Sequence, residues 1–172
     1  MISLVVSLIF VIYAGLVVAL IAGWRLAIRN PQPVNLQDRT FISIIIAARN
    51  EEGNITSLLN DIAAQSYQHI EVIVVDDHSQ DATTEKVMQE MKRDNRIRLS
   101  KNDGEGKKQA LTMGIKLAQG SIIIATDADC RVNPTWIESL LPYFSSPDSK
   151  MVFGGVSISA KSFFDDAQAL EF

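Results

Sequence analysis

Two aspartates one residue apart directly follow an apolar run in this sequence, because Asp127 and Asp129 come after Ser121–Thr126 (SIIIAT). In a strand, residues i and i+2 point to the same face, so both carboxylates can offer oxygens to one hard divalent cation. Mg²⁺ and Mn²⁺ suit this donor set, since they bind one or two protein carboxylates and complete their shell with water and substrate phosphates. The pair therefore predicts a Mg²⁺ or Mn²⁺ site that holds a diphosphate ligand. The alternative is an Asp-rich turn.

A second acidic pair, Asp76 and Asp77, follows the apolar run EVIVV. Adjacent carboxylates repel each other unless a ligand or a hydrogen-bond donor stabilises them. The functional interpretation is that one of them accepts hydrogen bonds from a nucleotide base or a ribose hydroxyl. The alternative is a turn in which Ser79 or Asp81 caps the next helix.

A glycine-containing basic segment, DGEGKK at 103–108, precedes a helical pattern. Glycines allow close backbone approach, and lysines at a positive helix end can hold phosphate. The Walker pattern GxxxxGK[ST] is missing, so a solvated basic turn stays the alternative. The single cysteine, Cys130, has no second thiol for a zinc shell and is assigned to packing.

Short apolar runs that alternate with segments of helical period must position these residues, and this alternation predicts a parallel α/β sheet with helices on both faces. Ligands of such sheets lie beyond the carboxyl ends of the strands. Three strands end in polar clusters there, which begin at Arg49, Asp76 and Asp127. The expected strands are Phe41–Ala48, Ile70–Val75, Ile97–Ser100, Ser121–Thr126 and Met151–Ser159.

Four helices are expected between and after these strands, and each is marked by an apolar stripe. The last begins at Asn133–Pro134, an N-cap followed by a proline at the first helical position. The stripes are Ile55, Leu58, Leu59 and Ile62; Val87, Met88 and Met91; Leu111, Ile115, Leu117 and Ala118; and Trp136, Ile137, Leu140 and Leu141.

The first residues form a different kind of segment, because Ile2–Trp24 carries no charge and is apolar all round. A helix of this length covers a hydrocarbon core of about 30 Å, so 1–29 is predicted to be a membrane span with a basic flank. Arg25 and Arg29 follow the span, and nothing basic precedes it. The positive-inside rule then places the remaining chain in the cytoplasm, after a linker at 30–38 that contains two prolines.

Charge excludes one class of partner from the domain predicted at 39–172. The chain from Asp38 onward holds all 20 Asp and Glu residues but only 14 of the 16 Lys and Arg residues. No basic stripe with interleaved aromatics occurs, so a nucleic-acid partner is not expected. The lone cysteine suits a reducing compartment.

Four segments in order, FISIIIAARNEEGNI, EVIVVDDHSQDAT, GEGKKQALTMGI and SIIIATDADC, resemble the successive signatures of the family 2 glycosyltransferases of GT-A fold. The resemblance covers Phe41 to about Phe172. It departs mildly in the first motif, where Ala-Ala-Arg-Asn replaces the common proline and tyrosine before the asparagine. It implies a membrane-anchored enzyme that takes a UDP- or GDP-sugar as donor and a glycan or lipid as acceptor.

Position by position, the resemblance implies a role for each candidate residue. Residues that border the nucleotide would be Ala48, Arg49 and Glu51. The base would lie against Asp77, with Asp76 beside it, and Lys107 would lie near the donor. Asp127 would contact ribose or diphosphate and the metal, and Asp129 would be the main Mg²⁺ or Mn²⁺ ligand.

The family resemblance also implies an inverting reaction, in which a carboxylate acts as general base on the acceptor hydroxyl. That base lies well downstream of Asp-x-Asp in the family, and this chain contains no such motif before Phe172. The terminal KSFFDDAQALEF has no helix stop, so we expect a C-terminally truncated domain that binds donor and metal without completing transfer.

Other classes remain open from the residues alone. A receiver domain of two-component signalling also has an acidic pair after one strand and an Asp after a later one. It lacks the βα unit that precedes Asp76 here and leaves the pair Asp127/Asp129 unexplained. A nucleotidyltransferase would need a basic glycine-rich loop where this chain has AARNEEGNI. A non-catalytic membrane protein with a GT-A-like fold is the third alternative.

Overall fold

The computed structural model describes residues 2–27, 40–144 and 149–155, with side chains placed from Val6 to Gly23 in the first range. The chain divides into two compact units, Met1–Pro33 and Val34–Phe172, which are described separately. Three predictions lie outside the described residues: the linker at 30–38, the basic residue Arg29, and the unterminated C-terminal helix.

The N-terminal unit contains one helix, α1 (Ile2–Ala27), of 26 residues. Its side chains from Val6 to Gly23 are almost all exposed, and the same window is long and apolar enough to cross a membrane. A helix of this length extends for about 39 Å, which exceeds a hydrocarbon core of about 30 Å. An apolar surface on every side is what lipid contact requires.

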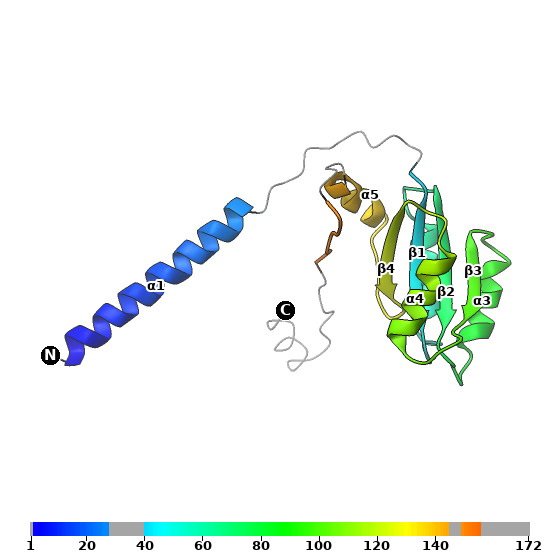
Figure 1. Cartoon of the computed structure of the whole chain (residues 1–172), viewed down its shortest axis with the longest axis horizontal. Coiled ribbons are helices and arrows are strands. Elements are labelled where there is room, and N and C mark those ends of the chain that lie inside the picture. Colours follow the sequence, from blue (N-terminus) through cyan, green and yellow to red (C-terminus); the bar gives the residue numbers. More distant parts are fainter. Residues whose placement is uncertain (1, 28–39, 145–148, 156–172) are drawn as a thin grey trace. The chain divides into compact units, whose positions relative to one another are not determined.

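The second unit is built on a four-stranded parallel sheet in the order β3-β2-β1-β4 (Figure 1). Ala48 pairs with Asp76 and Ala47 pairs with Asp127, so these three strands end at one level. Asp76 in turn pairs with Lys101 at the end of β3. The strands are β1 (Ile42–Ala48), β2 (Ile70–Asp76), β3 (Ile97–Lys101) and β4 (Ile122–Asp127).

Helices cover both faces of the sheet, as the sequence predicts. Alternate residues of β1 divide between two cores: Ile44 packs on the face of α2, α3 and α5, and Ile45 packs on the face of α4. Figure 1 shows α4 in front of the strands. The helices are α2 (Ile55–Ala63), α3 (Thr83–Met91), α4 (Lys107–Leu117) and α5 (Trp136–Leu140), followed by the 3₁₀ turn η1 (Leu141–Phe144).

The apolar stripe predicted for α4 is wrong in part. Ile115 and Leu117 are largely exposed, whereas Ala110 and Gly114 face the sheet. A Cβ on Gly114 would lie 2.4 Å from Cγ2 of Ile45, so small residues let α4 pack close to β1. Ile115 and Leu117 therefore point away, whereas Leu111 and Ala118 of the predicted stripe pack against the core, as expected.

Two smaller expectations also need correction. Met88 is exposed on α3, where Val87 makes the buried contact. Residues Met151–Gly155, the described part of the fifth expected strand, are not in a strand, and the rest of that segment lies outside the described residues. The other four strands and the stripe on α2 are confirmed.

A buried carboxylate, Glu71 of β2, fixes the end of the sheet opposite the acidic strand ends. Its Oε1 accepts hydrogen bonds from Ser43 Oγ at 2.5 Å and from the Gln119 amide at 2.6 Å, and its Oε2 pairs with Arg98. Burial raises the pKa of Glu71, but these hydrogen bonds and the Arg98 guanidinium outweigh burial and hold the pKa below its usual range. The connection from α4 to β4 is thereby tied to β1 and β2.

Replacing Glu71 with Gln is expected to lower the free energy of unfolding by about 1 to 3 kcal/mol. Glutamine carries an N–H₂ group in place of one carboxylate oxygen. This donor would face either the Arg98 guanidinium or the Gln119 N–H, which are donors themselves, so one hydrogen bond is lost. Chemical denaturation of the full chain in detergent measures the change. The same substitution at exposed Glu138 is the control and is expected to change stability by less than about 0.5 kcal/mol. Equal midpoints for the two variants would contradict the assignment.

Candidate functional site

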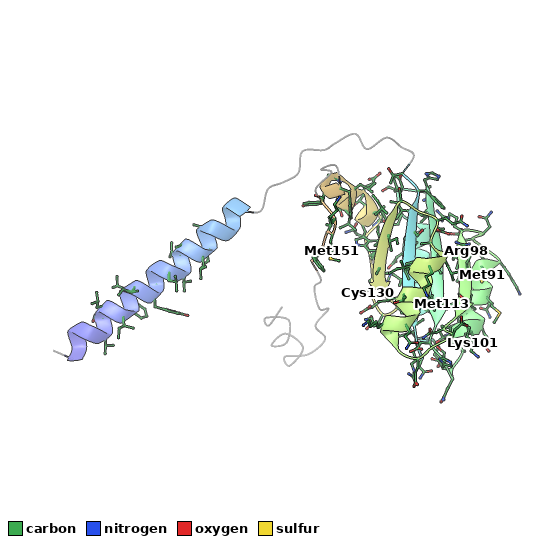
Figure 2. The ribbon with its side chains drawn as sticks, viewed as in Figure 1. Met91, Arg98, Lys101, Met113, Cys130 and Met151 are labelled. Carbon is green, nitrogen blue, oxygen red and sulfur yellow. The ribbon has the colours of Figure 1, made fainter. Side chains whose placement is uncertain are left out.

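The polar residues selected from the sequence gather where the strands end. The level pairing of β1 with β2 and β4 brings the three connections after these strands to one edge of the sheet. Figure 2 labels Lys101, the last residue of β3, at this edge, where polar side chains crowd together. The edge therefore holds the sequence-predicted residues from Ala48 to Asp129.

The loops after β1 and β2 are hydrogen-bonded to each other. The Asn50 amide donates to Ser79 Oγ at 3.0 Å, and the Gln80 amide donates to Asn50 Oδ1 at 2.8 Å. Asn50 and His78 both have a positive φ, 56° and 63°. Asparagine and histidine adopt this conformation more readily than most residues other than glycine, and the two hydrogen bonds between the loops hold Asn50 in it.

A second set of bonds joins the same loops closer to the helices. The Glu52 amide donates to Asp81 Oδ2 at 3.1 Å, and the Ala82 amide donates to Glu52 Oε2 at 2.9 Å. The Glu51 amide donates to Thr83 Oγ1 at 2.8 Å. Asp81 also accepts from the Thr83 amide, but the N-cap of α3 is Ala82, which makes no side-chain cap hydrogen bond. The alternative of a helix cap by Ser79 or Asp81 is therefore wrong, and both residues join the loops instead.

Asp77 lies at the centre of the edge and is only 4% exposed. Its Oδ1 accepts from Asn102 Nδ2 at 2.7 Å and from the Gly106 amide at 3.0 Å, while Arg49 lies 3.8 Å from Oδ2. The Asn102 hydrogen bond does most to lower the pKa of Asp77, and Gly106, His78 and Arg49 lower it further against the effect of burial. Asp77 is thus an ionised carboxylate that holds the start of α4.

Asp76 is buried as well, but it points into the turn. Its Oδ1 accepts from the Ser79 amide at 3.2 Å, and its carbonyl accepts from the Asn102 amide at 2.8 Å. These contacts favour a supporting role for Asp76 next to Asp77.

The carboxylates of Asp127 and Asp129 are exposed at the end of β4, on either side of Ala128, which packs into the core. Lys107, the first residue of α4, places its Nζ 2.7 Å from Asp127 Oδ1. Gly106 just before it has a φ of 91°, a conformation that favours glycine. The structure therefore brings Lys107 to Asp127, one of the two predicted metal residues.

The donor set fits a hard divalent cation with an open coordination shell. Asp127 and Asp129 offer carboxylate oxygens, and the Lys107 ammonium already lies on Asp127 as a cation would. Within the described residues, no three His, Cys, Asp or Glu side chains form a group that could hold a metal ion. Mg²⁺ or Mn²⁺ here would depend on water and phosphate oxygens for its remaining ligands.

Helix α2 holds the segment that follows Asp129. Arg131 forms a two-pronged ion pair with Asp61, with contacts of 2.5 and 2.8 Å, and this hydrogen bonding lowers the pKa of Asp61. Gln65 Nε2 donates to the Asn133 carbonyl at 2.6 Å, and Gln65 Oε1 accepts from the Ile137 amide at 3.1 Å. These contacts fix the course of the chain beyond the metal residues.

Sequence reasoning missed Asn102, Asp61 and Gln65 as residues that shape the site. Asn102 directly follows β3, so the rule that polar residues after strands line the site could have found it. Asp61 and Gln65 carry no such signal, because Asp61 lies in the last turn of an amphipathic helix and Gln65 lies two residues beyond that helix.

A parallel sheet with helices on both faces and acidic residues at the ends of neighbouring strands defines the second unit as a GT-A domain. The family model "Glycosyl transferase family 2" matches residues 43–171, and the chain belongs to that family. Membership of this family excludes the two alternatives of a receiver domain and a nucleotidyltransferase.

Individual relatives support the same assignment. Glycosyltransferase GlyG of Streptococcus pneumoniae is 34% identical over 114 residues, which cover 66% of this chain and 38% of GlyG. The chain thus spans well under half the length of that relative.

Two solved structures share the fold. Mannosyltransferase PcManGT of Pyrobaculum calidifontis, in complex with GDP-Man and Mn²⁺, has a TM-score of 0.64 and 25% identity over 81% of this chain and 43% of its own. TarS 1-349 of S. aureus, in complex with UDP, has a TM-score of 0.55 and 26% identity over 60% of this chain and 31% of its own.

Proposed function

We propose that this chain binds a nucleoside-diphosphate sugar together with Mg²⁺ or Mn²⁺ as the donor-binding part of an inverting glycosyltransferase. The observation that carries the proposal is the arrangement at the end of β4, where exposed Asp127 pairs with the Lys107 ammonium and exposed Asp129 follows two residues later. Carboxylates for a metal and a cation for phosphate are the two groups that a metal-bound diphosphate requires. Complexes of similar proteins with UDP and with GDP-Man and Mn²⁺ support it.

The proposed roles follow the positions of the side chains. Asp77 would accept a base N–H on Oδ2, since both oxygens share the Gly106 amide but only Oδ1 also accepts from Asn102, and Asp76 would support it. The half-exposed Arg49 lies within reach of the same carboxylate and would border the nucleotide with Ala48 and Glu51.

The diphosphate and the metal belong to the other half of the site. Lys107 would contact the diphosphate, Asp127 the ribose or diphosphate and the metal, and Asp129 the metal. The metal, when bound, would stabilise the charge of the leaving nucleoside diphosphate. None of the described residues is assigned as the general base on the acceptor.

We further propose that α1, the one candidate span among the described residues, anchors this chain in the cell membrane, with the GT-A domain on the cytoplasmic side. Support comes from the length and apolar surface of α1 and from the basic residues Arg25 and Arg29 after it. Nucleotide sugars would then be reached from the cytosol, and the acceptor would be a glycan or a lipid at that face.

Replacing Asp129 with Asn is expected to weaken Mn²⁺-dependent nucleotide binding by at least about tenfold, because a neutral amide oxygen replaces a charged metal ligand. Calorimetric titration of the full chain in detergent with UDP and with GDP, each with and without MnCl₂, measures this. The matched control is Asp103→Asn, another exposed aspartate at the same edge, and its affinity is expected to stay within about twofold of wild type.

Two results would count against the proposal. Retained Mn²⁺-dependent binding in Asp129→Asn would remove Asp129 as a metal ligand. A folded wild-type chain that binds neither nucleotide would favour a non-catalytic GT-A-like membrane protein.

A further inference from the structure

Lys107 at the start of α4 and Asp127 at the end of β4 belong to two parts of the proposed site, and their side chains form an ion pair across it. Their atoms lie 2.7 Å apart, and the side chains are 61% and 52% exposed. An ion pair this exposed contributes little stability and can exchange partners readily. Lys107 therefore lies on a proposed metal ligand and has access to solvent.

The backbone at Lys107 is held in place, whereas its ammonium lies at the end of a long, exposed side chain. The preceding residue, Gly106, donates its amide to both oxygens of Asp77 at 3.0 and 3.1 Å. Asp77 is in turn held by Asn102 at 2.7 Å. These bonds fix where α4 begins, so the flexible part of Lys107 is its four-carbon stem.

The charges of these side chains affect the binding of the metal ion and of the donor differently. Asp127 and Asp129 carry two negative charges, and Lys107 neutralises one of them in the pair it forms. A metal ion that arrives alone must displace the ammonium or bind a site of reduced charge. A donor brings its own negative diphosphate, which attracts the metal and gives the displaced ammonium a new partner.

We propose that Lys107 occupies Asp127 in the donor-free protein and passes to the donor diphosphate when the metal takes Asp127. The inference rests on the proposed function and adds a regulation of that site: metal and nucleotide favour each other's binding. The coupling is reciprocal by thermodynamic linkage, so UDP tightens Mn²⁺ binding by the same factor as Mn²⁺ tightens UDP binding.

The test is Lys107→Met in the full chain in detergent, with free Mn²⁺ followed by electron paramagnetic resonance. Mn²⁺ alone is expected to bind the variant about two- to fivefold more tightly than wild type, because Asp127 is no longer neutralised. With Mn²⁺ present, the UDP or GDP that wild type binds is expected to bind the variant about threefold or more weakly. General damage to the site would weaken both ligands, so opposite changes identify the exchange.

Lys116→Met is the matched control, since it removes the same charge from an exposed lysine in the last turn of α4, at the opposite end from Lys107. Both of its affinities are expected to stay within about twofold of wild type. Lys107→Gln is a second neutral variant, in case the methionine variant does not fold.

Three outcomes overturn the exchange: unchanged or weaker Mn²⁺ binding in both neutral variants, an equal gain in Lys116→Met, or wild-type metal and nucleotide affinities that are independent of each other. Failure of the proposed function has a different signature, because wild type would then bind no nucleotide at all.

Discussion

Replacing Asp77 with Ala is expected to lower the free energy of unfolding by about 2 to 4 kcal/mol and to remove nucleotide binding. The substitution leaves Asn102 Nδ2, which donates to Asp77 at 2.7 Å, without its acceptor in a buried position. The Gly106 amide loses both of its carboxylate oxygens, so the start of α4 is no longer fixed. Urea denaturation and nucleotide titration of the full chain measure the two effects.

The pH dependence of the folding stability tests the role of Asp77 independently. Contacts led by the Asn102 hydrogen bond lower the pKa of Asp77, so the folded state holds its charged form more strongly than the unfolded state does. That stability is present above the unfolded pKa of about 4 and is lost as pH falls below it. Asp77→Ala should therefore lose less stability than wild type on acidification below about pH 4.

A pair of exchanged residues separates the hydrogen bond from the charge. In Asp77→Asn the amide oxygen can still accept from Asn102 Nδ2, but the N–H₂ then takes the position of Oδ2, which faces the Gly106 N–H and the Arg49 guanidinium, both of them donors. Asp77→Asn combined with Asn102→Asp lets residue 77 donate to residue 102 and accept from Gly106. The double variant is expected to recover at least about half of the stability lost by Asp77→Asn, a coupling of the size measured for contacting pairs. Unchanged stability in Asp77→Ala, or no recovery in the double variant, would contradict the role given to this pair.

The elements and the site edge were predictable from sequence because their signals are local. Runs such as ISIIIAA and EVIVV indicate buried parallel strands without reference to any partner, and β1 and β2 are buried along nearly their whole length. The run SIIIAT also forms a strand, but β4 lies at the edge of the sheet, and Ile123 is 40% exposed. Once strands are parallel, the residues after them, Asp77 and Asp127 among them, must lie at one edge. That inference needs neither the strand order nor the register.

Contacts between loops could not be predicted in the same way, because they depend on which strands are neighbours. Asn50 meets Ser79 and Gln80 only because β1 and β2 are adjacent. Asn102 reaches Asp77 only because β3 lies next to β2. Sequence spacing contains no information about these distances.

The orientation of α4 shows a further limit. Apolar periodicity favours Ile115 and Leu117 as core residues, but the helix packs through Ala110 and Gly114. Close approach to Ile45 selects the small side chains, and hydrophobicity alone does not reveal that requirement.

Gly120→Ala is expected to destabilise the GT-A domain by about 3 kcal/mol or more. A Cβ at Gly120 would lie 2.5 Å from the Ser43 nitrogen, 2.7 Å from the Ile42 carbonyl carbon and 2.8 Å from the Phe41 oxygen. All three are backbone atoms at the start of β1, which is paired on both sides and cannot move away. Chemical denaturation of the full chain in detergent measures the loss.

Gly53→Ala is the matched control, because nothing lies within 4 Å of a Cβ built at Gly53. It is expected to change stability by less than about 0.5 kcal/mol. A Gly120→Ala chain as stable as this control would mean that the connection into β4 can move away from β1. The Gly120 amide, which donates to Ser43 Oγ at 2.8 Å, would then not hold that connection in place. The decrease in the free energy of unfolding expected for Glu71→Gln would then be smaller as well, since Glu71 binds the same Ser43 hydroxyl.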